Sequence, residues 1–137
     1  MNLYWVCDRR AQDEHKKPQR EIMLYIPEGV VAFGRRVFYG CTSMTEIKLP
    51  DTVRNFGWAT FKRCSSLKEI VIPEGVEELP MELFEHCTEL ERVTLPATIT
   101  NIQDGVFNDC PKLTIFAPVG CYAENYATKA KIPFVAV

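Results

Sequence analysis

The chain repeats itself every 23 residues, and this period restricts its fold more than any other feature of the sequence. Four cysteines stand at that interval, namely Cys41, Cys64, Cys87 and Cys110. A phenylalanine precedes each of them by three residues, at Phe38, Phe61, Phe84 and Phe107. A unit this short cannot bury its own apolar face, so the units must stack on one another around a shared, elongated core.

Further apolar columns keep the same period and indicate the structure of each unit. They are Val30, Val53, Val76 and Ile99; Phe33, Phe56, Leu79 and Ile102; Met44, Leu67, Leu90 and Leu113; and Pro27, Pro50, Pro73 and Pro96. In "LKEIVIP", Ile70 and Ile72 alternate with Glu69 and Val71, which is typical of a strand with one buried face. Pro73 ends the strand because proline has no N–H to donate. A second short strand or a 3₁₀ turn is expected before the next cysteine.

These columns resemble the leucine-rich repeats of the BspA-like type, whose 23-residue unit has the pattern L-x-x-I-x-I-P followed by A-F-x-x-C. The resemblance covers about residues 21–134. It implies a repeat solenoid that is mainly β, with short turns or 3₁₀ segments. The expected fold is a right-handed leucine-rich-repeat solenoid of about four coils plus a C-terminal cap with a short helix. Pro80 and Gln103 depart from the pattern, because the first two units have Gly34 and Gly57 there.

The resemblance also predicts three parts of the chain. Residues 1–20 are expected to supply an N-terminal strand, from "MNLYWVC", and a charged segment, together a candidate cap. Residues 21–117 form the four repeats, and residues 118–137 form the C-terminal capping unit. Both ends of a solenoid need such covers, because an open end is an unpaired strand edge.

The predicted C-terminal helix has one face of residues three and four apart: Tyr122, Ala123, Tyr126 and Ala127. Cys121 stands where the family often has serine, so the usual hydroxyl for the helix N-cap is absent.

Composition excludes several classes of protein. The 137 residues fit a single domain, and 47% hydrophobic with 25% charged residues is ordinary for a folded globular chain. A net charge of -2 gives no basic surface for nucleic acid. No segment approaches the roughly 20 apolar residues of a membrane helix, so membrane insertion is not expected.

The N-terminal "LYWV" is too short for the apolar region of a secretory signal. We therefore expect a cytoplasmic protein as the chain is written, and a cell-surface or secreted one if the chain is a processed fragment.

The cysteines are interpreted as packing residues. Zinc sites usually bring ligands in close pairs, whereas the repeating cysteines are 23 residues apart. Neighbouring coils would bring them within about 4.8 Å, which leaves disulfides geometrically open. Their repetition together with Phe, Leu and Ile favours burial as small apolar residues. Cys7 and Cys121 lie outside the column and are the better candidates for exposure or pairing.

A catalytic thiol was considered for Cys64, because Lys62 and Arg63 beside it would lower the pKa of a thiol. These bases do not recur in the other units, whereas the cysteine does. His86 precedes Cys87, but adjacent residues on an extended segment point apart. No Walker loop, dinucleotide fingerprint or H-E-x-x-H motif is present. We predict that the protein is not an enzyme and uses no cofactor or metal.

The outward strand positions are the candidate partner-binding residues. They form two ladders across the coils: Met23, Glu46, Glu69 and Arg92, with Ile115 as the next member, and Tyr25, Lys48, Val71 and Thr94. Their mixed charge and apolar contacts suit a protein surface better than a small molecule, and an ordinary solvated sheet is the alternative. Trp58, near the opposite edge, either contacts a partner or covers a gap between coils.

These observations lead to two hypotheses. The first is a protein-binding module that acts by occupying its partner, as an adaptor, competitor or inhibitor. The alternative is a fragment or small member of a bacterial cell-surface adhesin family that binds host proteins, a role with which the resembling family is often associated.

Overall fold

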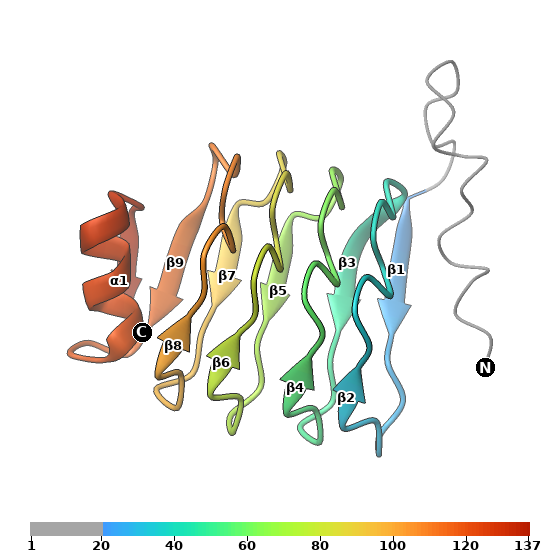
Figure 1. Ribbon diagram of the computed structural model, residues 1–137, viewed down its shortest axis with the longest axis horizontal. Helices are drawn as coiled ribbons and strands as arrows, with labels where there is room; N and C mark the ends of the chain where they lie inside the picture. The colour runs from blue at the N-terminus through green and yellow to red at the C-terminus, as the bar shows by residue number, and fades with distance from the viewer. Residues whose placement is uncertain (1–20) are drawn as a thin grey trace.

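The computed structural model of the protein describes residues 21–137, which form an elongated solenoid (Figure 1). Each coil contributes one strand to a parallel sheet of six strands, in the order β1-β3-β5-β7-β9-β10. The strands are β1 (Ile22–Tyr25), β3 (Met44–Lys48), β5 (Glu69–Val71), β7 (Arg92–Thr94), β9 (Thr114–Ala117) and β10 (Phe134–Ala136). The predicted solenoid of stacked short strands is confirmed, and the expectations for residues 1–20 lie outside the described residues.

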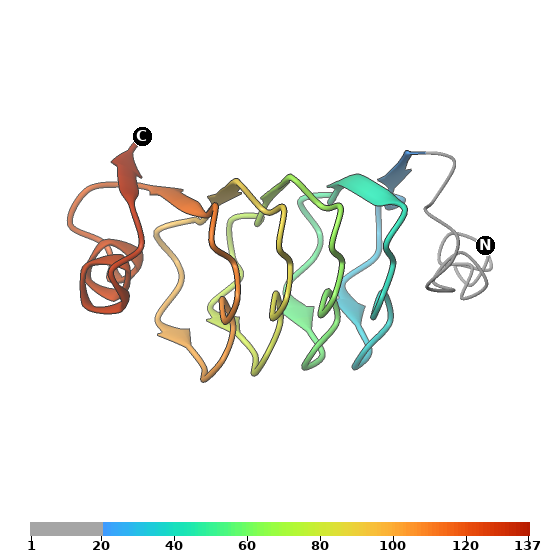
Figure 2. The same ribbon diagram turned by 90° about the horizontal axis from the view of Figure 1, so that it is seen from above.

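Short strands line the opposite side of the solenoid (Figure 2). They are β2 (Ala32–Phe33), β4 (Asn55–Phe56), β6 (Glu78–Leu79) and β8 (Asn101–Ile102). In each, the first side chain is exposed and the second is buried, which agrees with the predicted second strand. They pair in parallel as β2–β4 and β6–β8.

Proline explains why this second layer is divided in two. The N–H of Gly57 donates to the carbonyl of Phe33 at 2.8 Å, and the N–H of Gln103 donates to the carbonyl of Leu79 at 3.0 Å. The equivalent residue of the coil between them is Pro80, which has no N–H to donate. The layer therefore breaks between β4 and β6, at one of the two positions where the sequence departs from the repeat pattern.

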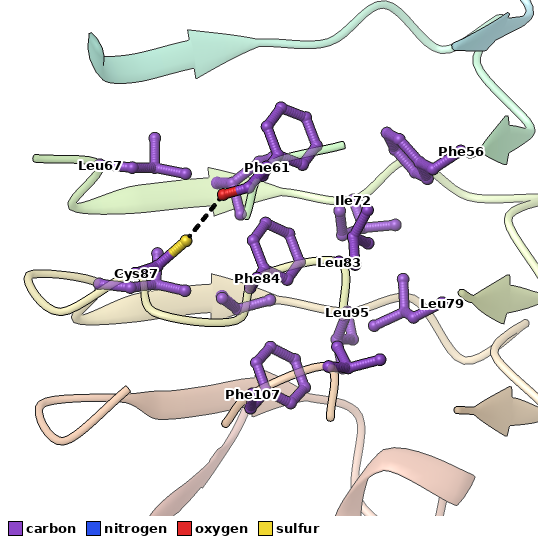
Figure 3. Close-up of a cluster of buried hydrophobic side chains, with 14 of the residues drawn as sticks. Phe56, Phe61, Leu67, Ile72, Leu79, Leu83, Phe84, Cys87, Leu95 and Phe107 are labelled. Atoms are coloured by element: carbon purple, nitrogen blue, oxygen red, sulfur yellow. Dashed lines mark hydrogen bonds between the residues drawn. The ribbon is translucent and has the colours of Figure 1, made fainter. Parts of the chain in front are cut away.

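Stacked phenylalanine rings form the axis of the core (Figure 3). The ring centroids of Phe61 and Phe84 lie 5.4 Å apart with an interplanar angle of 6°. Phe38 continues the stack on one side at 5.6 Å, and Phe107 on the other at 5.7 Å. Because these residues are one repeat apart, each coil places its ring on the ring of the coil before it.

The C-terminal cap consists of a helix and a strand, as the resemblance implied. Helix α1 (Tyr122–Ala130) buries Ala123 and Ala127, and the chain then returns as β10, which pairs in parallel with β9. Tyr126 is half-buried and Tyr122 is exposed, so the predicted helix face is only partly covered. Cys121 is the N-cap residue and its side chain makes no capping hydrogen bond.

Substitution of Phe61 by alanine is expected to lower the free energy of unfolding by about 3–5 kcal/mol, because a fully buried ring is replaced by a cavity. Urea unfolding followed by circular dichroism measures this loss. Phe116→Ala is the matched control, since Phe116 is only partly buried on the sheet surface. A loss for Phe61→Ala no larger than for the control would contradict a core organised around the ring stack.

Candidate functional site

The outward residues of the long sheet form the predicted ladders. Met23 lies beside Glu46, Glu46 beside Glu69, and Glu69 beside Arg92 on neighbouring strands. The prediction that Ile115 follows Arg92 is wrong. Arg92 pairs with Thr114, and Ile115 is fully buried beside Val93.

The physical reason is a coil one residue shorter than the repeat. Arg92 and Thr114 are 22 residues apart, whereas Glu69 and Arg92 are 23 apart. A shift of one residue in a strand turns every side chain to the opposite face. The uninterrupted 23-residue count therefore selected an inward residue.

The second ladder runs beside the first. Tyr25 pairs with Lys48, Val71 pairs with Thr94, and Thr94 pairs with Phe116. Tyr25 is 64% exposed and Val71 is 59% exposed, so large apolar side chains point into solvent from the middle of the sheet. We call the outward surface of these two ladders the sheet face.

Charges on the sheet face are only partly neutralised within the chain. Lys48 Nζ lies 2.7 Å from Glu46 Oε1, and this hydrogen bond raises the pKa of Lys48. The guanidinium of Arg92 lies 4.1 Å from the centre of the Phe116 ring. Glu69 lies between Glu46 and Arg92 and forms no ion pair within residues 21–137.

A shallow hollow of about 500 Å³ opens on this face. Its lining residues are Glu21, Thr45, Glu46, Lys68, Glu69, Glu91, Arg92, Thr114 and Phe116. Carboxylates, cations and one aromatic ring thus surround the same depression, at the end of the sheet face where the strands begin.

Trp58 is not part of the sheet face. It follows β4, in the opposite layer of the solenoid, and is 42% exposed. The guanidinium of Arg36 lies 6.0 Å from the Trp58 ring and 4.4 Å from the Tyr39 ring. The structure therefore brings together eight of the nine predicted residues and separates Trp58 from them.

The repeating cysteines are packing residues that also donate hydrogen bonds. Cys64 Sγ donates to the carbonyl of Phe38 at 3.1 Å, and Cys87 Sγ donates to the carbonyl of Phe61 at 3.1 Å (Figure 3). Burial raises the pKa of the Cys64 thiol to about 12 and that of Cys87 further. Cys121 is half-buried with a free thiol, and Cys7 lies outside the described residues.

A charged network on the lateral edge was missed by the sequence reasoning, which treated these residues as freely exposed. Lys62 Nζ contacts Glu82 at 2.9 Å and Glu85 at 2.8 Å, and the hydrogen bond from Lys62 lowers the pKa of Glu85. His86 Nδ1 lies 2.8 Å from Asp109 Oδ2. Lys62 and Glu85, like His86 and Asp109, are one repeat apart. Opposite charges at that spacing are the signal that would have predicted the network.

Chemistry beyond binding finds little support in the described part of the chain. Among residues 21–137 no group of three or more His, Cys, Asp or Glu side chains is placed to hold a metal ion. The one helix in the same range is too short to span a bilayer.

A parallel solenoid with one strand per coil and an exposed sheet face defines a repeat protein whose coils present surface ladders. A family model described as "BspA type Leucine rich repeat region" matches residues 21–121 in six copies. The chain belongs to this family, as its repeat columns predicted.

Solved bacterial structures agree. A leucine-rich repeat protein from Bacteroides ovatus is 29% identical with a TM-score of 0.69, over 86% of this chain and 30% of that one. The T. pallidum leucine-rich repeat protein is 29% identical with a TM-score of 0.59, over 73% and 60%. A leucine rich cell surface protein from Faecalibacterium prausnitzii is 28% identical with a TM-score of 0.57, over 80% and 35%.

The chain thus spans well under two thirds of the length of each of these proteins. A comparison with curated proteins finds no match.

Cys64 and Cys87 should react with iodoacetamide at least about a hundredfold more slowly in the folded protein than in denaturant, because the buried thiols rarely ionise. Mass spectrometry of the digested protein gives the rate for each cysteine. The half-buried Cys121 is the internal control and should react faster than either. Equal rates for Cys64 in folded and denatured protein would show that it is not a packing residue.

Proposed function

We propose that the chain is a non-catalytic protein-binding module that occupies a partner macromolecule through its sheet face. It acts in this proposal as an adaptor, competitor or inhibitor. The observation that supports it most is the row of outward residues that the core does not require. Met23, Tyr25 and Val71 are large apolar side chains that are 47%, 64% and 59% exposed, and the sheet that presents them is rigidly stacked.

A protein partner fits this surface better than a small molecule. The hollow is wide and shallow, whereas sites for small molecules are concave and mostly apolar. Protein interfaces are enriched in Tyr, Met and Arg, and the face offers Tyr25, Met23 and Arg92. The unpaired carboxylate of Glu69, at the centre, is available to a cation of the partner. Membership of a repeat family supports a binding role in general, and the sheet face gives it a location.

Arg92→Glu and Tyr25→Ala are each expected to weaken the complex with the native partner at least about tenfold, since one reverses a central charge and the other removes an exposed ring. The partner is first captured on the immobilised protein from an extract of the native host, and biolayer interferometry then measures the affinities. Lys129→Glu, an exposed charge change on α1, is the control and should leave binding unchanged. Unchanged binding in both sheet-face variants would count against this site.

A second candidate function is that of a piece, or a small member, of a bacterial cell-surface protein that binds host proteins. It is favoured by the similarity to the F. prausnitzii protein, which is described as a cell surface protein and of which the chain covers 35%. This candidate uses the same sheet face. It differs from the first in placing the chain outside the cell, whereas the first places it in the cytoplasm.

Labelling of intact native cells with a membrane-impermeant amine reagent separates the two candidates. Exposed lysines such as Lys112, Lys129 and Lys131 would be modified on intact cells if the chain is at the surface. The cytoplasmic module predicts modification only after lysis. A known cytoplasmic protein in the same sample controls for leakage.

A further inference from the structure

Two columns of exposed residues lie on the side of the solenoid away from the sheet face. The first, the Trp58 column, consists of Arg35, Trp58, Met81 and Asp104. The second, the Arg54 column, consists of Val31, Arg54, Glu77 and Thr100. Each column takes one residue from each of four successive coils. We call the two columns together the back face.

Backbone hydrogen bonds fix the order of these residues. In the Trp58 column, Arg36 N–H donates to the carbonyl of Trp58 at 3.0 Å, and Ala59 N–H donates to that of Met81 at 3.0 Å. In the Arg54 column, Arg54 N–H donates to the carbonyl of Val31 at 2.8 Å, and the same bond joins the next pair of coils. The back face is therefore a rigid pattern with one coil spacing, about 4.8 Å, between its rows.

Charge on the back face changes sign halfway along the solenoid. The first two coils supply Arg35 and Arg54, and the next two supply Glu77 and Asp104. None of these four side chains forms an ion pair within residues 21–137. The basic and acidic halves thus remain without partners inside the chain.

Arg54 and Glu77 stay apart although their coils are adjacent. The guanidinium of Arg54 donates to the carbonyls of Asp51 and Val53 and lies against Gly75, where a Cβ would meet it. The break between β4 and β6 separates the two coils here, and a hollow of about 470 Å³ lies between them with both residues on its lining.

Exposed apolar side chains occupy the middle of the pattern. Trp58 is 42% exposed and Met81 is 48% exposed, and they are consecutive members of the Trp58 column. A neighbouring pair of such side chains between a basic and an acidic end has the arrangement of an interface core with a charged rim. The whole column reads basic, apolar, apolar, acidic.

We propose that the back face binds a second copy of this chain in an antiparallel dimer. The two-fold axis lies in the interface, parallel to the strands and between β4 and β6. This rotation reverses the order of the coils while each column faces itself. Arg35 then meets the partner's Asp104, Trp58 meets the partner's Met81, and Arg54 meets the partner's Glu77.

Self-complementarity follows from the order of the residues and not from their composition alone. A parallel arrangement would set Arg35 against the partner's Arg35 and Asp104 against the partner's Asp104, and like charges repel. The antiparallel arrangement satisfies both columns at once, and a two-fold interface forms each contact twice. The sheet face is on the other side of the solenoid (Figure 2), so the dimer would present two sheet faces to bivalent partners.

Sedimentation velocity of the whole chain, at rising protein concentration, tests the dimer. In about 0.05 M salt we expect twice the monomer mass at high concentration, and in about 0.5 M salt a weaker dimer, since salt screens exposed charges. Arg35→Glu alone and Asp104→Arg alone should each raise the dissociation constant at least about tenfold. An equimolar mixture of these two variants should recover the dimer, because each new charge then meets its opposite.

Trp58→Ala should also weaken the dimer at least about tenfold, whereas Val71→Ala, an exposed apolar change on the sheet face, should not. Circular dichroism of each variant checks that it folds. A wild-type chain that is monomeric in low salt at every concentration would overturn the proposal, as would a mixture of charge variants that stays monomeric. If Trp58→Ala abolishes binding of the native partner and leaves the mass unchanged, the back face binds a different protein. None of these outcomes depends on the sheet face.

Discussion

The hydrogen bonds between successive coils are the interaction on which the rest of the structure depends. Phe38, Phe61 and Phe84 each donate a backbone N–H to a carbonyl of the next coil, at 2.9–3.0 Å. These bonds hold residues one repeat apart directly above one another. Once the coils are in register, each position of the period has a fixed environment, whether ring stack, thiol column or surface ladder. The identity of a residue then decides only what its ladder presents.

Because the environment follows from the period, the core and the strands could be predicted from the sequence with little error. The prediction failed where the period itself changes, at Ile115, because one missing residue exchanges the two faces of a strand. The pairing of Lys62 with Glu85 was missed for a different reason. Single residues were compared with their neighbours in sequence, whereas their neighbours in space are one repeat away.

Some turn conformations follow the repeat and not the residue. Arg63, His86 and Asp109 all adopt φ between 58° and 62° at the same point of successive coils, although arginine rarely takes this conformation. The coil-to-coil hydrogen bonds at these turns offset the local strain, since Arg63 N–H donates to Glu85 at 2.8 Å and His86 N–H to Asn108 at 2.9 Å. Local turn preference could not have predicted them, because the bonds involve residues more than twenty positions away.

The two faces of the solenoid differ in how their charges are compensated. On the sheet face, Lys48 neutralises Glu46 within the same strand, so any partner gains mainly from short-range contacts. On the back face the charges are separated along the axis and unpaired, so attraction acts over a Debye length and depends on orientation. Pro80 contributes to this difference, because the layer breaks where the charge changes sign, and the break keeps Arg54 from neutralising Glu77. A single departure from the repeat thus leaves this surface able to distinguish the two orientations of a second copy.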